Sequence, residues 1–193
     1  MLLPAQAEDM TDTIERDVHA PSDAGARQTN RQNAEKGFDA SAKLTRNLQL
    51  VLVDLIELHL QGKQAHWNVV GKNFRDLHLQ LDEIVEAARV FSDEVAERLR
   101  ALHAIVDGRS DTVAATTSLP EFPNGEILTS DCIDLITTRL DTTVARIRKV
   151  HDSVDEEDPT SSDLLHQIIA RLEQLSWMVG AENRVPAATI KGE

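Results

Sequence analysis

The sequence predicts an all-α protein built as a bundle of four long helices. In four long segments, apolar residues recur with the period of about 3.6 residues that is typical of an amphipathic helix. No segment shows the apolar–polar alternation of a β-strand. Aromatic content is only 3%, with no tyrosine, so the core is expected to consist of Leu, Ile, Val and Ala. With 193 residues, the chain is long enough for one domain with a substantial core.

The first two helices are expected on either side of a break that contains a glycine. The apolar pattern of the first helix begins near residue 38 and runs to about residue 64. The segment 66–73, which holds Gly71, interrupts this pattern. The second helix is then expected over about 74–103, where the same period returns.

A long connection is expected between the second and third helices. Residues 108–128 contain Gly, Ser, Thr and two prolines, which leaves room for at most a short helix. A connection of this length is typical of a crossover between distant ends of a bundle. The third helix is expected over about 130–154 and the fourth to about Ala181, with Ser161 or Ser162 as its N-cap. This order of elements indicates a ferritin-like four-helix bundle.

The bundle is expected to occupy residues 38–183, between two terminal segments. Residues 1–37 are polar with little apolar periodicity, as in a flexible arm, and residues 184–193 form a short C-terminal tail. The apolar runs are far shorter than the roughly 20 residues that span a bilayer, and the opening segment MLLPAQAEDM, with its Pro4 and early acids, is not expected to act as a secretory signal. Cys132 is the only cysteine, which fits a reducing compartment. We therefore expect a cytoplasmic protein with no membrane partner.

One predicted helix carries four side chains of metal-ligand type on a single face. His78, Asp82, Asp93 and Glu97 fall within about 100° of arc on the second helix. The apolar stripe of that helix lies on an adjoining arc and contains Leu77, Leu81, Ile84, Ala88, Val95 and Leu99. The ligand face is therefore separate from the packing face, and His66 lies shortly before the helix begins.

This ligand face is too long to bind a single ion. The pair His78/Asp82 lies about 16 Å along the helix axis from the pair Asp93/Glu97, at roughly 1.5 Å per residue. Metal–ligand bonds are only about 2.0–2.6 Å long. An antiparallel copy of the helix, related by a twofold axis, would bring the two half-sites together. The spacing therefore predicts a metal site at a dimer interface.

The ligand types narrow the choice of metal. Two imidazoles and three carboxylates suit Fe(II), Mn(II) or Zn(II) better than Mg²⁺ or Ca²⁺, which prefer oxygen alone. Each residue alone is more often an ordinary surface or core residue, so the prediction depends on their joint placement. The chain has no Glu-x-x-His sequence, the motif that places a di-iron centre inside the usual bundle. A centre in the bundle interior is therefore disfavoured.

The same region resembles the signature of the Dps proteins, the mini-ferritins of bacteria. The segment reads KQAHWNVVGKNFRDLHLQLDE, followed by SDEVAER, and the resemblance covers roughly residues 38–183. It implies a hollow shell of twelve four-helix bundles, with a short helix in the long connection. The ferroxidase centres of this family lie at twofold interfaces. The resemblance implies that one subunit provides His66, His78 and Asp82, and that its partner provides Asp93 and Glu97.

The resemblance also implies the chemistry. Each inter-subunit centre would hold two iron ions and oxidise Fe(II), preferably with hydrogen peroxide. The ferric mineral would be stored inside the shell, protecting the cell from oxidative stress. Trp67, beside a ligand, is a candidate electron donor in the family and otherwise a packing anchor at a subunit contact.

Several neighbouring residues each allow two interpretations. Lys63 either pairs with a carboxylate of the site when metal is absent or is simply solvated. His59, two turns before His66, either extends the site or is an ordinary helix histidine. Three aspartates of the third helix either line an entry pore for cations or form a solvated helix face: Asp131, Asp134 and Asp141.

The acidic composition of the chain disfavours DNA binding. It carries 33 acidic and 20 basic residues, for a net charge of −13, and such a surface attracts cations and repels phosphates. Many Dps proteins bind DNA through a Lys/Arg-rich arm, whereas residues 1–40 here hold eight acids and four bases. A local patch at Arg27, Arg31 and Lys36 leaves some room for DNA or nucleoid association, which we do not favour. The alternatives are a DNA-condensing protein with secondary iron chemistry, or a Dps-like shell with another metal-dependent reaction.

Overall fold

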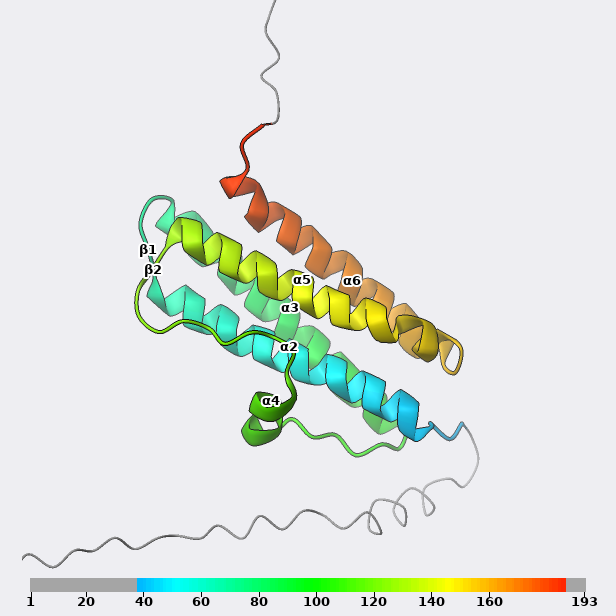
Figure 1. The fold of residues 1–193 in the computed structure, drawn as a ribbon. Helices are drawn as coiled ribbons and strands as arrows, with labels where there is room; N and C mark the ends of the chain where they lie inside the picture. Colours follow the sequence, from blue (N-terminus) through cyan, green and yellow to red (C-terminus); the bar gives the residue numbers. More distant parts are fainter. Residues whose placement is uncertain (1–37, 187–193) are drawn as a thin grey trace, which may run out of the picture.

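The computed structural model describes residues 38–186, which form a bundle of four long helices (Figure 1). These helices are α2 (Ala42–Asn68), α3 (Phe74–Ala101), α5 (Thr129–Asp155) and α6 (Pro159–Gly180). A short helix, α4 (Ser110–Thr116), lies in the connection between α3 and α5, and a 3-10 helix, η1 (Ala181–Asn183), follows α6. The predicted all-α bundle with a long connection and a short helix is confirmed. The predicted N-terminal arm, its basic patch and most of the C-terminal tail lie outside the described residues.

The apolar stripes of the four long helices meet in one continuous core. Helix α2 packs against α3 and α5, and α6 packs against α5 and α3. All six residues of the predicted stripe on α3 are buried: Leu77, Leu81, Ile84, Ala88, Val95 and Leu99. Because this stripe faces inward, the polar arc beside it lies at the surface of the bundle.

A glycine lets α2 and α3 approach each other closely near the predicted ligands. A Cβ atom at Gly62 would lie only 2.9 Å from Val85 Cγ2, closer than side-chain contacts allow. Gly62 lies one helical turn before His66 on α2. The close approach therefore brings the end of α2 against the beginning of α3, where His78 lies.

Two predicted helix boundaries are wrong. Helix α2 continues to Asn68, so His66 lies in its last turn and not in a break; the chain leaves the helix only before Gly71, whose φ is +121°. Helix α6 begins at Pro159, because proline is favoured in the first turn of a helix, where its missing N–H costs nothing. Asp158 is therefore the N-cap residue, and Ser161 and Ser162 lie inside the first turn.

The structure also contains a short parallel bridge that the sequence did not predict. Strand β1 (Val69–Val70) pairs with β2 (Ile127–Leu128), with Val69 opposite Ile127. The bridge joins the turn after α2 to the end of the long connection. Two residues are too few to show an alternating pattern, which is why this pairing leaves no sequence signal.

A buried carboxylate holds the long connection against the bundle. Asp54 of α2 is fully buried and accepts hydrogen bonds from the Ser118 N–H at 2.7 Å and the Thr117 hydroxyl at 3.1 Å. Arg146 of α5 donates to the same carboxylate at 3.1 Å. Because its charge is both paired and hydrogen-bonded, Asp54 can stay buried.

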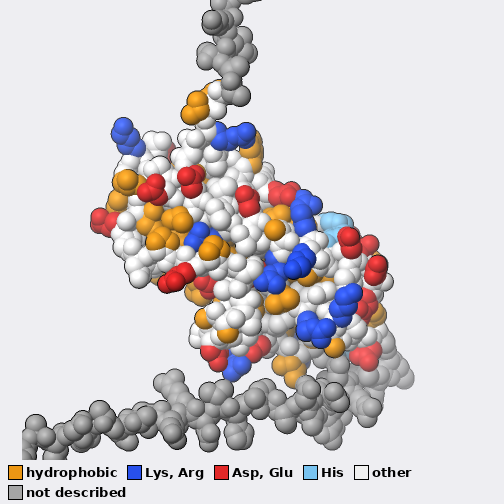
Figure 2. All heavy atoms as spheres, in the orientation of Figure 1, with side chains coloured by type: hydrophobic (Ala, Val, Ile, Leu, Met, Phe, Trp, Pro, Cys, Tyr) orange, Lys and Arg blue, Asp and Glu red, His pale blue; other side chains and the backbone are white. Residues whose placement is uncertain are grey.

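Among residues 38–186, each helix is either too short or too polar to span a bilayer. On the face shown in Figure 2, Lys and Arg side chains gather from its middle toward its right side, and Asp and Glu side chains lie mostly around this group.

Candidate metal centre

Three of the predicted ligands lie together where the end of α2 meets the beginning of α3. One ligand atom from each of His66, His78 and Asp82 lies within 4.8 Å of those of the other two. Among the residues that the structure describes, these three form the only such group of His, Cys, Asp or Glu. We call them the histidine half-site. His66 is buried, and the other two are partly exposed.

Two reciprocal hydrogen bonds orient the histidines. His66 Nδ1 lies 3.1 Å from the His78 carbonyl oxygen, and His78 Nδ1 lies 3.1 Å from the His66 carbonyl oxygen. A carbonyl oxygen only accepts, so each Nδ1 carries the proton and donates it, and His66 Nδ1 lies 3.3 Å from a second acceptor, Asp82 Oδ1. In a neutral imidazole the Nε2 lone pair is then free to bind a metal. The two rings are stacked with their centroids 3.6 Å apart, so both are held rigidly.

A lysine is paired with the third residue of the histidine half-site. Lys63 Nζ donates to Asp82 Oδ1 at 2.7 Å, so the paired interpretation of Lys63 applies in this structure. The hydrogen bond from Lys63 is the main reason that the pKa of Asp82 is lowered, and the nearby His66 and His78 lower it further. Asp82 is therefore an ionised carboxylate at neutral pH. The lysine ammonium provides the positive charge that a metal ion would otherwise bring.

The remaining predicted ligands are separate from this cluster. Asp93 and Glu97 lie farther along α3, are exposed, and do not join the histidine half-site. We call them the carboxylate half-site. Trp67, next to His66 in sequence, is 70% exposed in the single chain. The chain by itself thus brings together three of the five predicted ligands.

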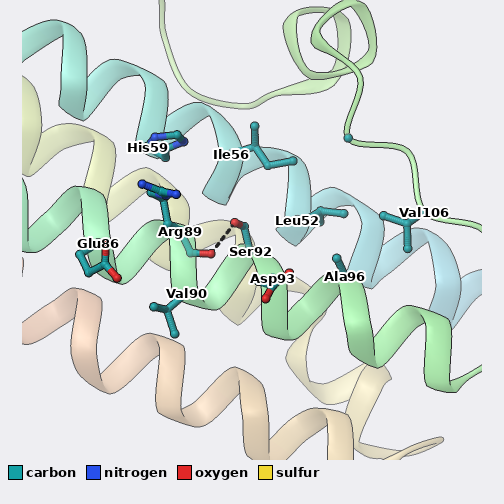
Figure 3. Close-up of a pocket in the computed structure, with 11 residues that line it drawn as sticks. Leu52, Ile56, His59, Glu86, Arg89, Val90, Ser92, Asp93, Ala96 and Val106 are labelled. Carbon is teal, nitrogen blue, oxygen red and sulfur yellow. Dashed lines mark hydrogen bonds between the residues drawn. The ribbon is translucent and has the colours of Figure 1, made fainter.

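His59 lies near Asp93 of the carboxylate half-site and is not part of the histidine half-site. It lines a surface hollow of about 600 Å³ together with Glu86, Arg89 and Asp93 (Figure 3). Burial lowers the pKa of His59, and the positive charges of Arg89 and Lys63 lower it further. His59 is therefore neutral at neutral pH.

The three aspartates considered for an entry pore all lie on α5. Asp141 accepts a hydrogen bond from the Ser176 hydroxyl at 2.7 Å, and Asp134 accepts one from the Asn183 side chain at 2.9 Å. Asp131 is exposed at the start of the helix. Two of the three thus tie α5 to α6 and η1, and their role in a pore stays a prediction.

Comparison with known proteins places this geometry in a family. The model of the ferritin-like domain family matches residues 45–184. The chain is 36% identical over 145 residues to DNA protection during starvation protein 2 of Deinococcus radiodurans, covering 75% of this chain but only 60% of that protein. It is 38% identical over 134 residues to the fine tangled pili major subunit of Haemophilus ducreyi, covering 69% of this chain and 71% of that protein.

A solved structure shows the same likeness in three dimensions. It is the structure of Dps from Microbacterium arborescens in the high iron form, to which this chain is 32% identical. The superposition has a TM-score of 0.70 and covers 76% of this chain and 98% of that one. The bundle of α2, α3, α5 and α6, with its long connection, is therefore ferritin-like.

Proposed function

Since the chain belongs to the Dps family of ferritin-like proteins, we propose that it oxidises Fe(II) and stores the ferric product in a shell of identical subunits. Iron is the substrate and cargo of this reaction. The proposal covers its ferroxidase activity, its storage of iron and a role in protecting the cell from oxidative stress.

The observation that carries the proposal is the histidine half-site. Two stacked imidazoles have each Nδ1 hydrogen-bonded to a backbone carbonyl, which leaves both Nε2 lone pairs unprotonated, and the Asp82 carboxylate belongs to the same group. Mixed nitrogen and carboxylate ligands suit Fe(II), and a hard anionic carboxylate favours Fe(III) over Fe(II). Residues already held in place lose little freedom on binding, so the site is organised before iron arrives.

The carboxylate half-site of a partner subunit would complete each centre. Asp93 and Glu97 share the polar face of α3 with His78 and Asp82 but lie about 16 Å away along the axis. Two α3 helices in antiparallel contact across a twofold axis would form two equivalent centres, each with two histidines and three carboxylates. We propose two iron ions per centre and, following the family, a dodecamer.

Hydrogen peroxide is the oxidant that we propose. Two Fe(II) ions each give one electron, the O–O bond breaks, and two protons are taken up, so one peroxide yields two water molecules. Two irons bound side by side allow both electrons to leave together, which avoids release of a hydroxyl radical. Trp67 would supply an electron when only one iron is bound; if it is only a packing anchor, Trp67→Phe will leave the radical yield unchanged.

The most direct test compares Fe(II) oxidation by peroxide in three proteins. These are the wild type, Asp93→Ala/Glu97→Ala, and a control in which two exposed acids of α3 outside the ligand arc are replaced, Asp76→Ala/Glu94→Ala. We expect the ligand variant to oxidise iron no faster than buffer and the control to match the wild type. Equal rates in all three proteins would refute the shared centre.

A second function is suggested by the name of the Deinococcus relative, DNA protection during starvation protein 2. The net charge of −13 argues against direct DNA condensation. We therefore propose a cytoplasmic iron protein whose nucleoid association, if present, is secondary. A gel-shift at low salt with iron-free protein tests this, and clear retardation of duplex DNA would favour the DNA-condensing alternative.

A further inference from the structure

Two charged residues lie on the polar face of α3 between its two half-sites. Glu86 and Arg89 fall within the same arc of about 100° that holds the four ligand-type side chains of this helix. Both are exposed, and within residues 38–186 neither forms a salt bridge. Figure 3 shows Glu86 and Arg89 one turn apart on this side of α3, with Arg89 pointing toward His59.

A shared metal centre defines how two α3 helices must align. With His78 and Asp82 opposite the partner's Glu97 and Asp93, the twofold axis crosses α3 between residues 87 and 88. Glu86 then faces the partner's Arg89, and by symmetry Arg89 faces the partner's Glu86. Each of these residues lies within about 2–3 Å of the axis along the helix, so four charges of alternating sign surround it.

The same two residues also disfavour dimers in which one α3 helix is shifted along the other. Sliding one helix by three residues, close to one turn, moves the axis to residue 86 or to residue 89. In the first case Glu86 faces its own copy, and in the second Arg89 does so. Like charges that face each other are destabilising, so both shifted dimers are penalised while the aligned one is favoured.

We propose that Glu86 and Arg89 form reciprocal ion pairs across the twofold axis, and that these pairs select a second copy of this chain in the alignment that completes the metal centres. They are positioning residues, because they act on the centre through the placement of α3. The inference rests on the proposed function for its alignment, but its test needs no iron.

Two surrounding features agree with this role. His59 of α2 lines the same hollow as Glu86 and Arg89, and it is neutral at neutral pH, so it does not compete with Arg89 for a partner's carboxylate. Arg75 and Arg100 would also face each other across this axis, with like charge. They lie about 19 Å from the axis along the helix, beyond both half-sites, and both are exposed, so solvent and salt screen their repulsion.

The test uses one chain made wholly positive at these positions and one made wholly negative. Glu86→Arg places two arginines on a subunit, and Arg89→Glu places two glutamates. Each variant repels its own copy, but a mixed pair has opposite charges at every cross-contact. Within each chain the i,i+3 neighbours stay repulsive, so recovery on mixing reports contacts between chains only.

Subunit composition is read by native mass spectrometry, with a small mass tag on one variant. We expect each variant alone to dissociate at about 10- to 100-fold higher protein concentration than the wild type. Mixed at equal amounts, the two should assemble at wild-type concentration, with equal numbers of the two chains in nearly every assembly. The matched control mixes Glu94→Arg with Lys43→Glu, two exposed sites off the arc with the same charge changes, and should combine at random.

The outcomes of this experiment test the ion pairs separately from the proposed ferroxidase activity. Wild-type assembly of each single variant, or random mixing of the two, would overturn it; circular dichroism checks that the helices are intact. Selective pairing without iron oxidation in the mixed assembly would support the ion pairs and refute the ferroxidase proposal.

Discussion

The two ends of the polar face of α3 differ in how much of their environment one chain supplies. At the histidine half-site, side chains from α2 and α3 contact one another: the two imidazoles are stacked and each is bonded to the other's backbone. At the carboxylate half-site, Asp93 and Glu97 are exposed and join no cluster of ligands within the described residues. Both ends belong to one continuous helix, yet only one is organised by the fold of the monomer.

This difference indicates how the ordering of the ligands is divided between the fold of one chain and its contact with a partner subunit. Imidazoles need their ring planes and tautomers defined, which requires close packing from a second element. Carboxylates can bind through either oxygen and adapt to the ion that they meet. We infer that the chain pre-orients its histidines and presents its exposed acids to the partner. Variants of each half-site, and of the residues beside them, test this division.

Removing either half-site should abolish the reaction. We expect His66→Ala/His78→Ala to reduce peroxide-dependent Fe(II) oxidation by about 100-fold or more, as loss of metal ligands usually does, and Asp93→Ala/Glu97→Ala to do the same. Stopped-flow absorbance of the ferric product measures both rates. If one double variant retains most of the wild-type rate, the two half-sites do not form one centre.

Mixing the two inactive variants should restore part of the activity. Each mixed interface contains one centre with all five ligands and one with almost none. With random pairing, about half of the dimers are mixed, so about a quarter of all centres should be intact. The recovered rate is measured after joint reassembly, and simple mixing of preassembled proteins is the control. No recovery would indicate that each centre lies within one subunit.

Widening the gap between α2 and α3 should weaken the histidine half-site alone. In Gly62→Ala the new Cβ would press on Val85, and overpacking of this kind typically costs about 1–3 kcal/mol of unfolding free energy. We expect a lower denaturant midpoint and weaker Co(II) binding, measured by its visible absorption. Gly108→Ala, where the nearest atom is the flexible Ile56 Cδ1 at 3.2 Å, should have the smaller effect on Co(II).

Lys63→Met should change both the affinity and the pH dependence of metal binding. The variant removes a cation that competes for Asp82, so Co(II) affinity near pH 7 should rise about two- to fivefold, the size expected for an exposed charge pair. The exposed Lys72→Met is the control.

The direction of the pH effect follows from the pKa of Asp82. Lys63 lowers this pKa in the folded protein, so the stabilisation from the pair is present above the unfolded-state pKa and is lost as pH falls through the lower folded value. Without Lys63 the pKa of Asp82 should rise toward its ordinary value, and Co(II) binding should begin to fail at a higher pH. NMR titration of the Asp82 carboxyl checks the shift, and an unchanged pKa would show that Lys63 is not its cause.

Much of the fold could be predicted because helical periodicity is a local property. The stripe from Leu77 to Leu99 is buried as predicted, since its spacing alone places it on one face. The end of α2 differs from the prediction because a glycine that follows a helix and one that breaks it look alike in sequence. The beginning of α6 differs because Pro159 occupies the first turn of the helix. The β1–β2 bridge has no detectable sequence signal, because its two strands are distant in the chain and each is only two residues long.

Residue spacing alone establishes which side chains share the polar face of α3 and that this face is too long for one ion, because helix geometry converts spacing directly into angle and distance. The tertiary structure alone decided that His66 meets His78, that their Nδ1 protons are committed to carbonyls, and that Lys63 holds Asp82. Those contacts join two helices whose separation depends on packing at Gly62. No spacing rule within one helix can report the distance to another.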